Sequence, residues 1–132
     1  SVQLERIVED ARSDGGPQIE LEVLAEHAPA NVANCFAAVL REALSNAMRH
    51  AHAQNVTVRC MEHPSFYQLI ITDDGTGATK TNSRGIAEGM GLGSMRERVE
   101  ALGGTFTAGP RAGAPGWRVF ATVPKQQGDE AR

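Results

Sequence analysis

Apolar residues recur along most of the chain with the periods of helices and strands. Three stretches have helical spacing, and five shorter stretches alternate between apolar and polar residues. The predicted helices span about 4–11, 32–50 and 92–102, and the predicted strands span 19–23, 55–62, 65–72, 105–108 and 117–123. Pro64-Ser65 lies between the second and third strands and predicts a hairpin there.

The order of these elements is helix, strand, helix, two strands, a long loop, helix and two strands. This order is neither a regular β-α alternation nor all-β. It predicts an α+β fold, a two-layer α/β sandwich in which a mixed sheet carries its helices on one face. A length of 132 residues fits one domain. We expect this domain at 1–124, and a polar, disordered tail at 125–132.

Hydrophobic periodicity is lost between Asp73 and Gly89, where Gly, Thr, Asn and Ser dominate. Long loops without structure of their own are uncommon in compact domains and are usually functional. The sequence therefore directs attention to this loop and to its two ends.

Composition narrows the class of protein. The net charge of -3 argues against a nucleic-acid partner, which would favour a concentrated basic face. No apolar run approaches the roughly 18 residues of a membrane span, and no signal peptide opens the chain. Cys35 and Cys60 form no CxxC pair, so we expect two buried thiols and a cytoplasmic domain. The N-terminus lacks an initiator Met, and we expect a fragment of a longer protein.

The long helix carries a polar side as well as an apolar stripe. Glu42, Asn46, Arg49 and His50 recur there every three or four residues, as neighbours on one helix face do. A solvated face is the simpler interpretation. However, a carboxylate one turn before an amide oxygen offers two hard oxygen donors of the kind that Mg²⁺ takes. Arg49 and His50, one turn on, would meet phosphates.

A first glycine segment, Asp73-Asp74-Gly75-Thr76-Gly77, follows a predicted strand directly. Asp and Gly are common in tight turns, which is the structural interpretation. The functional interpretation is that Asp73 accepts a hydrogen bond from an adenine amino group. The glycines would then let the backbone approach the flat base closely.

A second glycine segment, Gly89-Met90-Gly91-Leu92-Gly93-Ser94, opens the last predicted helix. Free N–H groups and the helix dipole favour a phosphate at such a position. The segment is not a dinucleotide-binding fingerprint, because its last position is Ser94 and no strand precedes it. It is not a Walker loop either, because no Gly-Lys-Ser/Thr follows.

Together and in this order, the three segments resemble the ATPase superfamily of gyrases, heat-shock chaperones, histidine kinases and mismatch-repair proteins. Residues 41–51 resemble its N-box, 73–77 its first glycine box and 89–93 its second. The continuation 94–104 is similar to sensor kinases of the nitrate-sensor type, whose N-box ends in a basic residue, His and Ala. Arg49-His50-Ala51 matches that ending. The resemblance covers about Ile19 to Pro124.

The resemblance implies a Bergerat fold that binds ATP and Mg²⁺. Asn46 would ligate Mg²⁺ with Glu42 beside it, and Asp73 would bind adenine. The stretch 74–88 would include a short ATP lid. The other implied ATP-binding positions are Arg49 and His50 near the phosphates, Gly75 and Gly77 at the base, and Gly89, Gly91, Leu92 and Gly93 along the triphosphate.

Two positions depart from the family pattern. Ser94 stands where many members of the subfamily have Gly. The larger kinase families often place a Thr in the last strand near adenine, where this chain has Phe120.

The implied function is the catalytic domain of a bacterial sensor histidine kinase. It would donate the γ-phosphate of ATP to a histidine on a separate dimerisation domain, which would pass it to a response regulator. The parent protein would be a homodimer, either soluble or membrane-anchored. No histidine here lies in the helical hairpin that carries such an acceptor; the chain has only His27, His50, His52 and His63.

Two alternatives remain open from the sequence. One is a single-domain anti-sigma-factor serine kinase of the same fold, and the other is a non-catalytic module that senses nucleotides. The Arg49-His50-Ala51 ending favours the histidine kinase over the first. The intact Glu42, Asn46 and Asp73 weigh against the second.

Overall fold

The structure is a computed structural model that describes residues 2–12, 16–25, 27–49, 51–75 and 91–126. Every predicted element is present, with ends that differ by a residue or two. The helices are α1 (Val2–Ala11), α2 (Ala30–Arg49) and α3 (Leu92–Glu100), and the strands are β1 (Gln18–Val23), β2 (Asn55–Glu62), β3 (Phe66–Asp73), β4 (Thr105–Pro110) and β5 (Trp117–Pro124).

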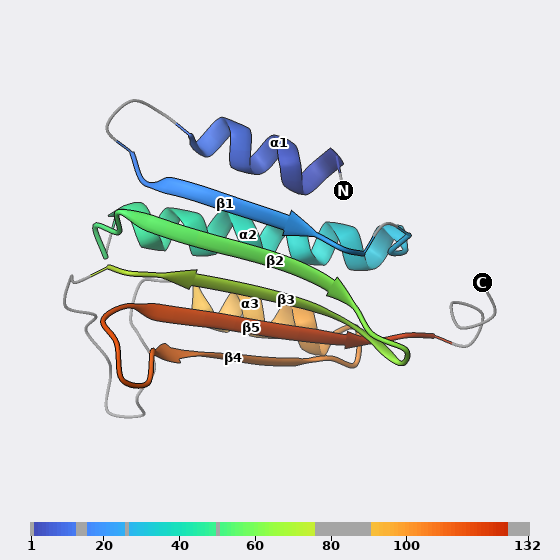
Figure 1. The fold of residues 1–132 in the computed structure, drawn as a ribbon. Coiled ribbons are helices and arrows are strands. Elements are labelled where there is room, and N and C mark those ends of the chain that lie inside the picture. The colour runs from blue at the N-terminus through green and yellow to red at the C-terminus, as the bar shows by residue number, and fades with distance from the viewer. Residues whose placement is uncertain (1, 13–15, 26, 50, 76–90, 127–132) are drawn as a thin grey trace.

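The five strands form one mixed sheet in the order β1-β2-β3-β5-β4 (Figure 1). β1 and β2 pair in parallel, because α2 returns the chain to the same end of the sheet between them. The other neighbouring strands pair antiparallel. β2 and β3 form the predicted hairpin, and the backbone N–H of His63 donates to the carbonyl of Phe66 at 2.8 Å in its turn.

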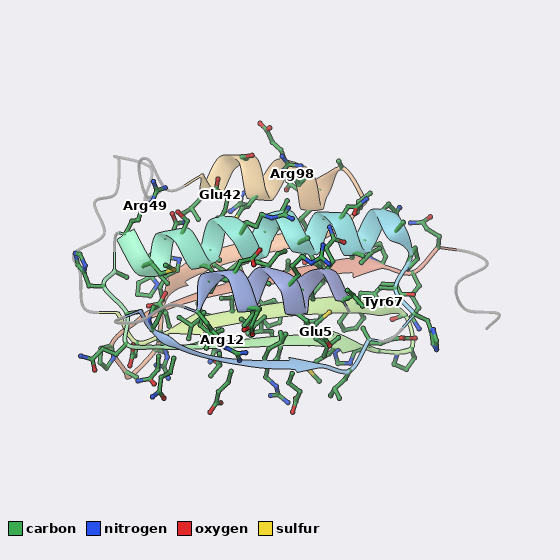
Figure 2. The ribbon with its side chains drawn as sticks, turned by 90° about the horizontal axis from the view of Figure 1, so that it is seen from above. Glu5, Arg12, Glu42, Arg49, Tyr67 and Arg98 are labelled. Atoms are coloured by element: carbon green, nitrogen blue, oxygen red, sulfur yellow. The ribbon has the colours of Figure 1, made fainter. Side chains whose placement is uncertain are left out.

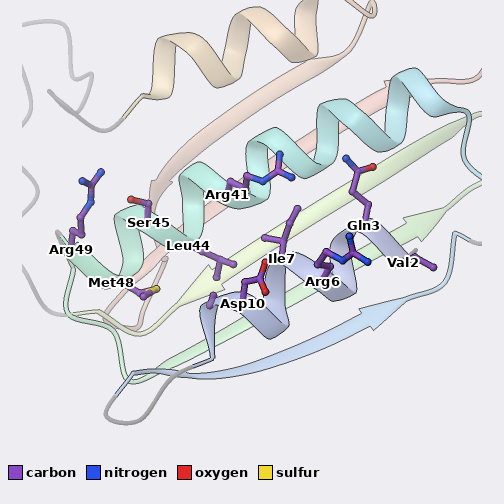
Figure 3. A pocket seen from close by; sticks show the side chains of 11 residues that line it. Val2, Gln3, Arg6, Ile7, Asp10, Arg41, Leu44, Ser45, Met48 and Arg49 are labelled. Carbon is purple, nitrogen blue, oxygen red and sulfur yellow. The ribbon is translucent and has the colours of Figure 1, made fainter.

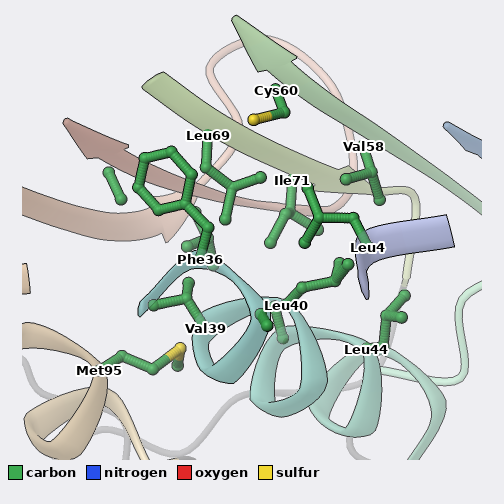
Figure 4. Close-up of a cluster of buried hydrophobic side chains, with 14 of the residues drawn as sticks. Leu4, Phe36, Val39, Leu40, Leu44, Val58, Cys60, Leu69, Ile71 and Met95 are labelled. Carbon is green, nitrogen blue, oxygen red and sulfur yellow. The ribbon is translucent and has the colours of Figure 1, made fainter. Parts of the chain in front are cut away.

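The three helices cover one face of the sheet, as predicted (Figure 2). α2 lies in the centre, with α1 packed on one side of it and α3 on the other. Apolar residues of α2 and of the inner face of the sheet make up the core between the layers (Figure 4). This core is largely aliphatic, and its largest fully buried side chains include Phe36, Leu4, Leu40, Leu69 and Met95.

Both cysteines are free and buried, in agreement with the sequence. Burial raises the pKa of Cys35, and it raises the pKa of Cys60 to about 11. Both thiols therefore stay protonated at neutral pH, which makes them poor nucleophiles.

Lys125 falls in the predicted tail but contacts the sheet. Its ammonium group donates to the Glu62 carboxylate at 2.7 Å and lies 5.3 Å from the centre of the Tyr67 ring. The side chain is only 8% exposed. Residues 127–132 of the predicted tail lie outside the described part of the chain. Within that part, no helix is both long and apolar enough to cross a membrane.

Candidate functional site

Asp73 is the last residue of β3 and is buried, with 8% of its surface exposed. Its carboxylate accepts a hydrogen bond from the backbone N–H of Gly75 at 2.8 Å and another from the backbone N–H of Trp117. Burial is the main cause that raises the pKa of Asp73, and the neighbouring Asp74 acts in the same direction. A buried carboxylate is costly unless something compensates it, so its place at a pocket points to a ligand.

A small pocket lies beside Asp73, between the last turns of α2 and the inner face of the sheet. Asn46 lines this pocket too and is only 5% exposed. Asn46 and Asp73 are the buried polar or charged residues among those the structure describes. The fold thus brings the N-box and the first glycine box together. The remaining lining residues are Ala43, Ala51, Ile71, Trp117 and Val119.

Phe120, which the resemblance aligned with a Thr near adenine in other kinases, does not line the pocket. Along β5 the buried positions alternate, and Phe120 falls between the buried residues Val119 and Ala121. A shift of one residue along a strand moves a side chain to the other face of the sheet. Trp117 and Val119 therefore stand beside Asp73 in the last strand, and Phe120 does not.

Gly75 is held against the end of α2. A Cβ atom at Gly75 would lie 2.3 Å from the Cβ of Ala51 and 2.6 Å from its carbonyl oxygen. Ala51 reaches this place because its backbone N–H donates to the carbonyl of Asn46 as the helix ends. Glycine is thus required at position 75 by packing within the protein, whatever its role toward a base.

Glu42 and Gly91 are in close contact, although they are far apart in the sequence. A Cβ atom at Gly91 would lie 2.9 Å from Oε2 of Glu42. Figure 2 shows Glu42 on the side of α2 that faces α3. The carboxylate of the N-box therefore stands at the start of α3, beside the second glycine box.

The start of α3 carries backbone donors that the helix itself leaves without a partner. Gly91 is the N-cap residue, with φ 66°, and supplies no side-chain cap. The N–H groups of a first helical turn have no partner within the helix and favour an anion. Gly93 lies in this turn, and a Cβ atom there would meet no atom of the described residues within 4 Å.

Arg49 does not join Asn46 at the pocket. It is exposed at the end of α2 and lines a groove of about 680 Å³ between α1 and α2 (Figure 3). Neither Glu42 nor Asp73 lines that groove. Leu92, the first residue of α3, is buried. The remaining predicted site residues, His50, Gly77 and Gly89, lie outside the described residues, as does the predicted lid from position 76 onward.

Asp74 has a structural role that the sequence pattern did not reveal. Asp74 is the first residue of the stretch predicted to include the lid, and its carboxylate fixes the end of β3 to the start of β2. One oxygen accepts from the backbone N–H groups of Gln54 and Asn55, both at 2.9 Å, and the other accepts from the Asn55 side chain at 2.8 Å. The hydrogen bonds from Asn55 are the main causes that lower the pKa of Asp74.

We expect Asp74→Ala to destabilise the protein by about 1–2 kcal/mol at neutral pH, because partly exposed hydrogen bonds each contribute modestly. A carboxylate with a lowered pKa in the folded state stabilises it above the unfolded pKa of about 3.9. That contribution is lost as the pH falls through the lower folded-state pKa. Urea unfolding at pH 7 and at pH 3 tests both points. Asp10→Ala, which removes an exposed carboxylate of α1, is the control, and an equal effect there would contradict the assignment.

The sequence matches one family model over residues 31–127, that of the histidine kinase-, DNA gyrase B- and HSP90-like ATPases. The chain belongs to this family, whose domain binds ATP, as the three motifs predicted.

The curated proteins that are similar to the chain include histidine kinases and sensor proteins. The chain is 38% identical over 88 residues to the histidine-protein kinase/phosphatase UhpB of Salmonella typhimurium, and the alignment covers 67% of this chain and 16% of UhpB. The chain is 36% identical over 96 residues to the nitrate/nitrite sensor protein NarQ of Escherichia coli, and this alignment covers 71% of the chain and 16% of NarQ. The chain thus spans about a sixth of either relative. These relatives favour a histidine kinase over an anti-sigma-factor serine kinase.

Solved structures confirm the fold. The histidine kinase domain of the blue-light-activated kinase EL346 from Erythrobacter litoralis superposes with a TM-score of 0.70 at 19% identity, over 92% of this chain and 57% of that one. The ATP-binding domain of PrrB from Mycobacterium tuberculosis gives 0.62 at 18% identity, over 95% and 93%. The α+β sandwich is therefore the ATP-binding fold of histidine kinases.

Proposed function

We propose that this domain holds Mg-ATP and donates its γ-phosphate to a histidine on the dimerisation domain of its parent kinase. A response regulator would then receive the phosphate, and the parent would act as a homodimer. Asp73 binds the adenine amino group, and the first turn of α3 binds the phosphates. Asn46 and Glu42 hold the metal ion.

The contact between Glu42 and Gly91 carries this proposal. It puts a carboxylate of the N-box against the glycine that caps α3. A triphosphate bound at that helix terminus would lie next to the Glu42 carboxylate, and the two negative charges would repel each other. A divalent cation between them removes the repulsion.

The available donors fit Mg²⁺ for the same reason. This ion takes carboxylate and amide oxygens, and it commonly completes its octahedron with water and phosphate oxygens. Glu42 and Asn46 supply one oxygen of each kind from successive turns of α2. When bound, the metal ion would neutralise the charge that the phosphates gather during transfer.

Phosphoryl transfer depends almost wholly on positioning and charge stabilisation, so a donor site without an acceptor does little. We therefore expect the chain alone to bind ATP, to hydrolyse it very slowly and to show no self-phosphorylation. Mixing it with the dimerisation domain of the parent should produce label from radioactive ATP on that domain. The label should be lost in acid, as phosphohistidine is.

The Asn46→Ala variant is the matched control, because it removes the amide oxygen that we assign to the metal ion. It should bind nucleotide with less dependence on Mg²⁺ and transfer little label. Acid-stable label on a serine of a partner would contradict the proposal in favour of a serine kinase. Rapid turnover of ATP by the chain alone would contradict it in favour of a hydrolase.

A further inference from the structure

Trp117, the only tryptophan of the chain, opens β5 next to the buried carboxylate of Asp73. The two residues are direct partners in the antiparallel pairing of β3 and β5. Side chains of directly paired residues lie on the same face of a sheet and within contact distance. Both accordingly line the pocket that also contains Asn46.

The backbone holds Trp117 in this place. Gly116 has φ 122°, and a Cβ atom there would lie 1.9 Å from the carbonyl oxygen of Asp73. The start of β5 is therefore pressed against the end of β3. The backbone N–H of Trp117 also donates to the Asp73 carboxylate, which ties the two residues together.

The indole nitrogen of Trp117 is the unexplained feature. Nε1 is buried and has no hydrogen-bond partner among the residues that the structure describes. Leaving a buried donor unsatisfied destabilises the folded protein. A phenylalanine would place an aromatic ring there without that cost. Trp117 lines the pocket, and a ligand that offers an acceptor there would supply the partner that its indole N–H lacks among the described residues.

We propose that the Trp117 indole N–H donates to N1 of the bound adenine, next to the amino group that Asp73 accepts from. The proposal rests on the proposed function, and it assigns the selection of the base to a pair of residues. Asp73 supplies an acceptor and Trp117 a donor. Adenine presents the complementary pair, an amino donor at position 6 and an acceptor at N1.

Guanine presents the reverse pattern at the same edge. Its oxygen at position 6 would face the Asp73 carboxylate, and its N1–H would face the indole N–H. Both contacts would set like groups against each other, and a site that leaves its polar groups unpaired rejects the wrong ligand strongly. Trp117 is thus a specificity-determining residue for ATP over GTP.

The test combines one variant with one altered nucleotide, followed by calorimetry. Trp117→Phe keeps an aromatic ring but removes the donor, and 1-deaza-ATP keeps the amino group but removes the acceptor at N1. Each change alone should weaken binding by about three- to tenfold, the range of one net hydrogen bond. Together they should cost no more than either one alone, because both remove the same hydrogen bond. Trp117→Phe should also narrow the preference for ATP over GTP.

The outcomes separate this inference from the proposed function. If the wild type binds ATP and 1-deaza-ATP equally, or if the two changes add independently, the role of Trp117 is wrong while ATP binding stands. If the wild type binds no ATP, the proposed function itself fails. Should Trp117→Phe not fold, equal binding of ATP and 1-deaza-ATP by the wild type would still overturn the role of Trp117. The fluorescence emission of Trp117, the single tryptophan, gives an independent test of the contact between Trp117 and the base. Adenosine alone should change this emission.

Discussion

Replacing Asp73 by Asn should weaken ATP binding by roughly ten- to hundredfold, because it removes a charge-assisted hydrogen bond worth about 1.5–3 kcal/mol. The substitution keeps the size of the side chain and one acceptor oxygen, so the loss reports the charge rather than the shape of the pocket. Calorimetric titration with ATP measures it. Asp10→Asn, at an exposed carboxylate of α1, is the matched control and should bind ATP as the wild type does. Unchanged affinity in Asp73→Asn would contradict the adenine assignment.

The same substitution should leave the stability of the nucleotide-free protein unchanged or raise it. Burial raises the pKa of Asp73 in the folded state. Such a carboxylate costs stability as the pH rises from the unfolded pKa of about 3.9 through the raised folded pKa. Above its unfolded pKa the wild type bears a cost that grows with pH, and the Asn variant does not. Thermal unfolding should therefore show the variant's advantage at pH 7, and the advantage should shrink near pH 4. A residue with a purely structural role would lose stability and affinity together.

The fold could be predicted from the sequence because its periodicities are regular and its breaks are sharp. β2 alternates from Asn55 to Cys60, and its two ends, Asn55 and Glu62, coincide with the prediction. The helices differ at their ends, where periodicity carries the least information. α2 begins at Ala30, before the first apolar residue of its stripe. The order of the strands, with β5 between β3 and β4, depends on contacts between distant residues and was not predicted.

The site could be predicted in its residue types but only partly in its geometry. Glu42, Asn46 and Asp73 were found because each lies in a motif with a recognisable chemistry. The hydrogen bonds of Asp74 and the position of Trp117 beside Asp73 were missed, since both depend on a partner that the fold supplies. For Asp74 that partner is Asn55, and for Trp117 it is Asp73. Only the register of the strands reveals these pairs.

Gly93 shows how a requirement of the fold can be separated from a requirement of the ligand. Gly75 and Gly104 both have neighbours that exclude a side chain. At Gly75 the neighbour is Ala51, and at Gly104 a Cβ atom would lie 2.0 Å from the Thr122 carbonyl oxygen. At Gly93 no neighbour among the described residues comes within 4 Å of such an atom. The described protein therefore does not need glycine at position 93, and a helix would favour alanine there.

Gly93→Ala should accordingly stabilise the nucleotide-free protein by about 0.5 kcal/mol, because alanine loses less conformational freedom in a helix. It should weaken ATP binding by at least about tenfold, since the new methyl group would stand where phosphates approach the first turn of α3. Calorimetric titration and thermal unfolding measure the two effects. Gly109→Ala, in an equally open position of β4, is the matched control and should leave the affinity unchanged. If Gly93→Ala binds ATP as tightly as the wild type, the phosphates do not lie against this turn, and the contact between Glu42 and Gly91 would have to be explained by the packing of α2 and α3 alone.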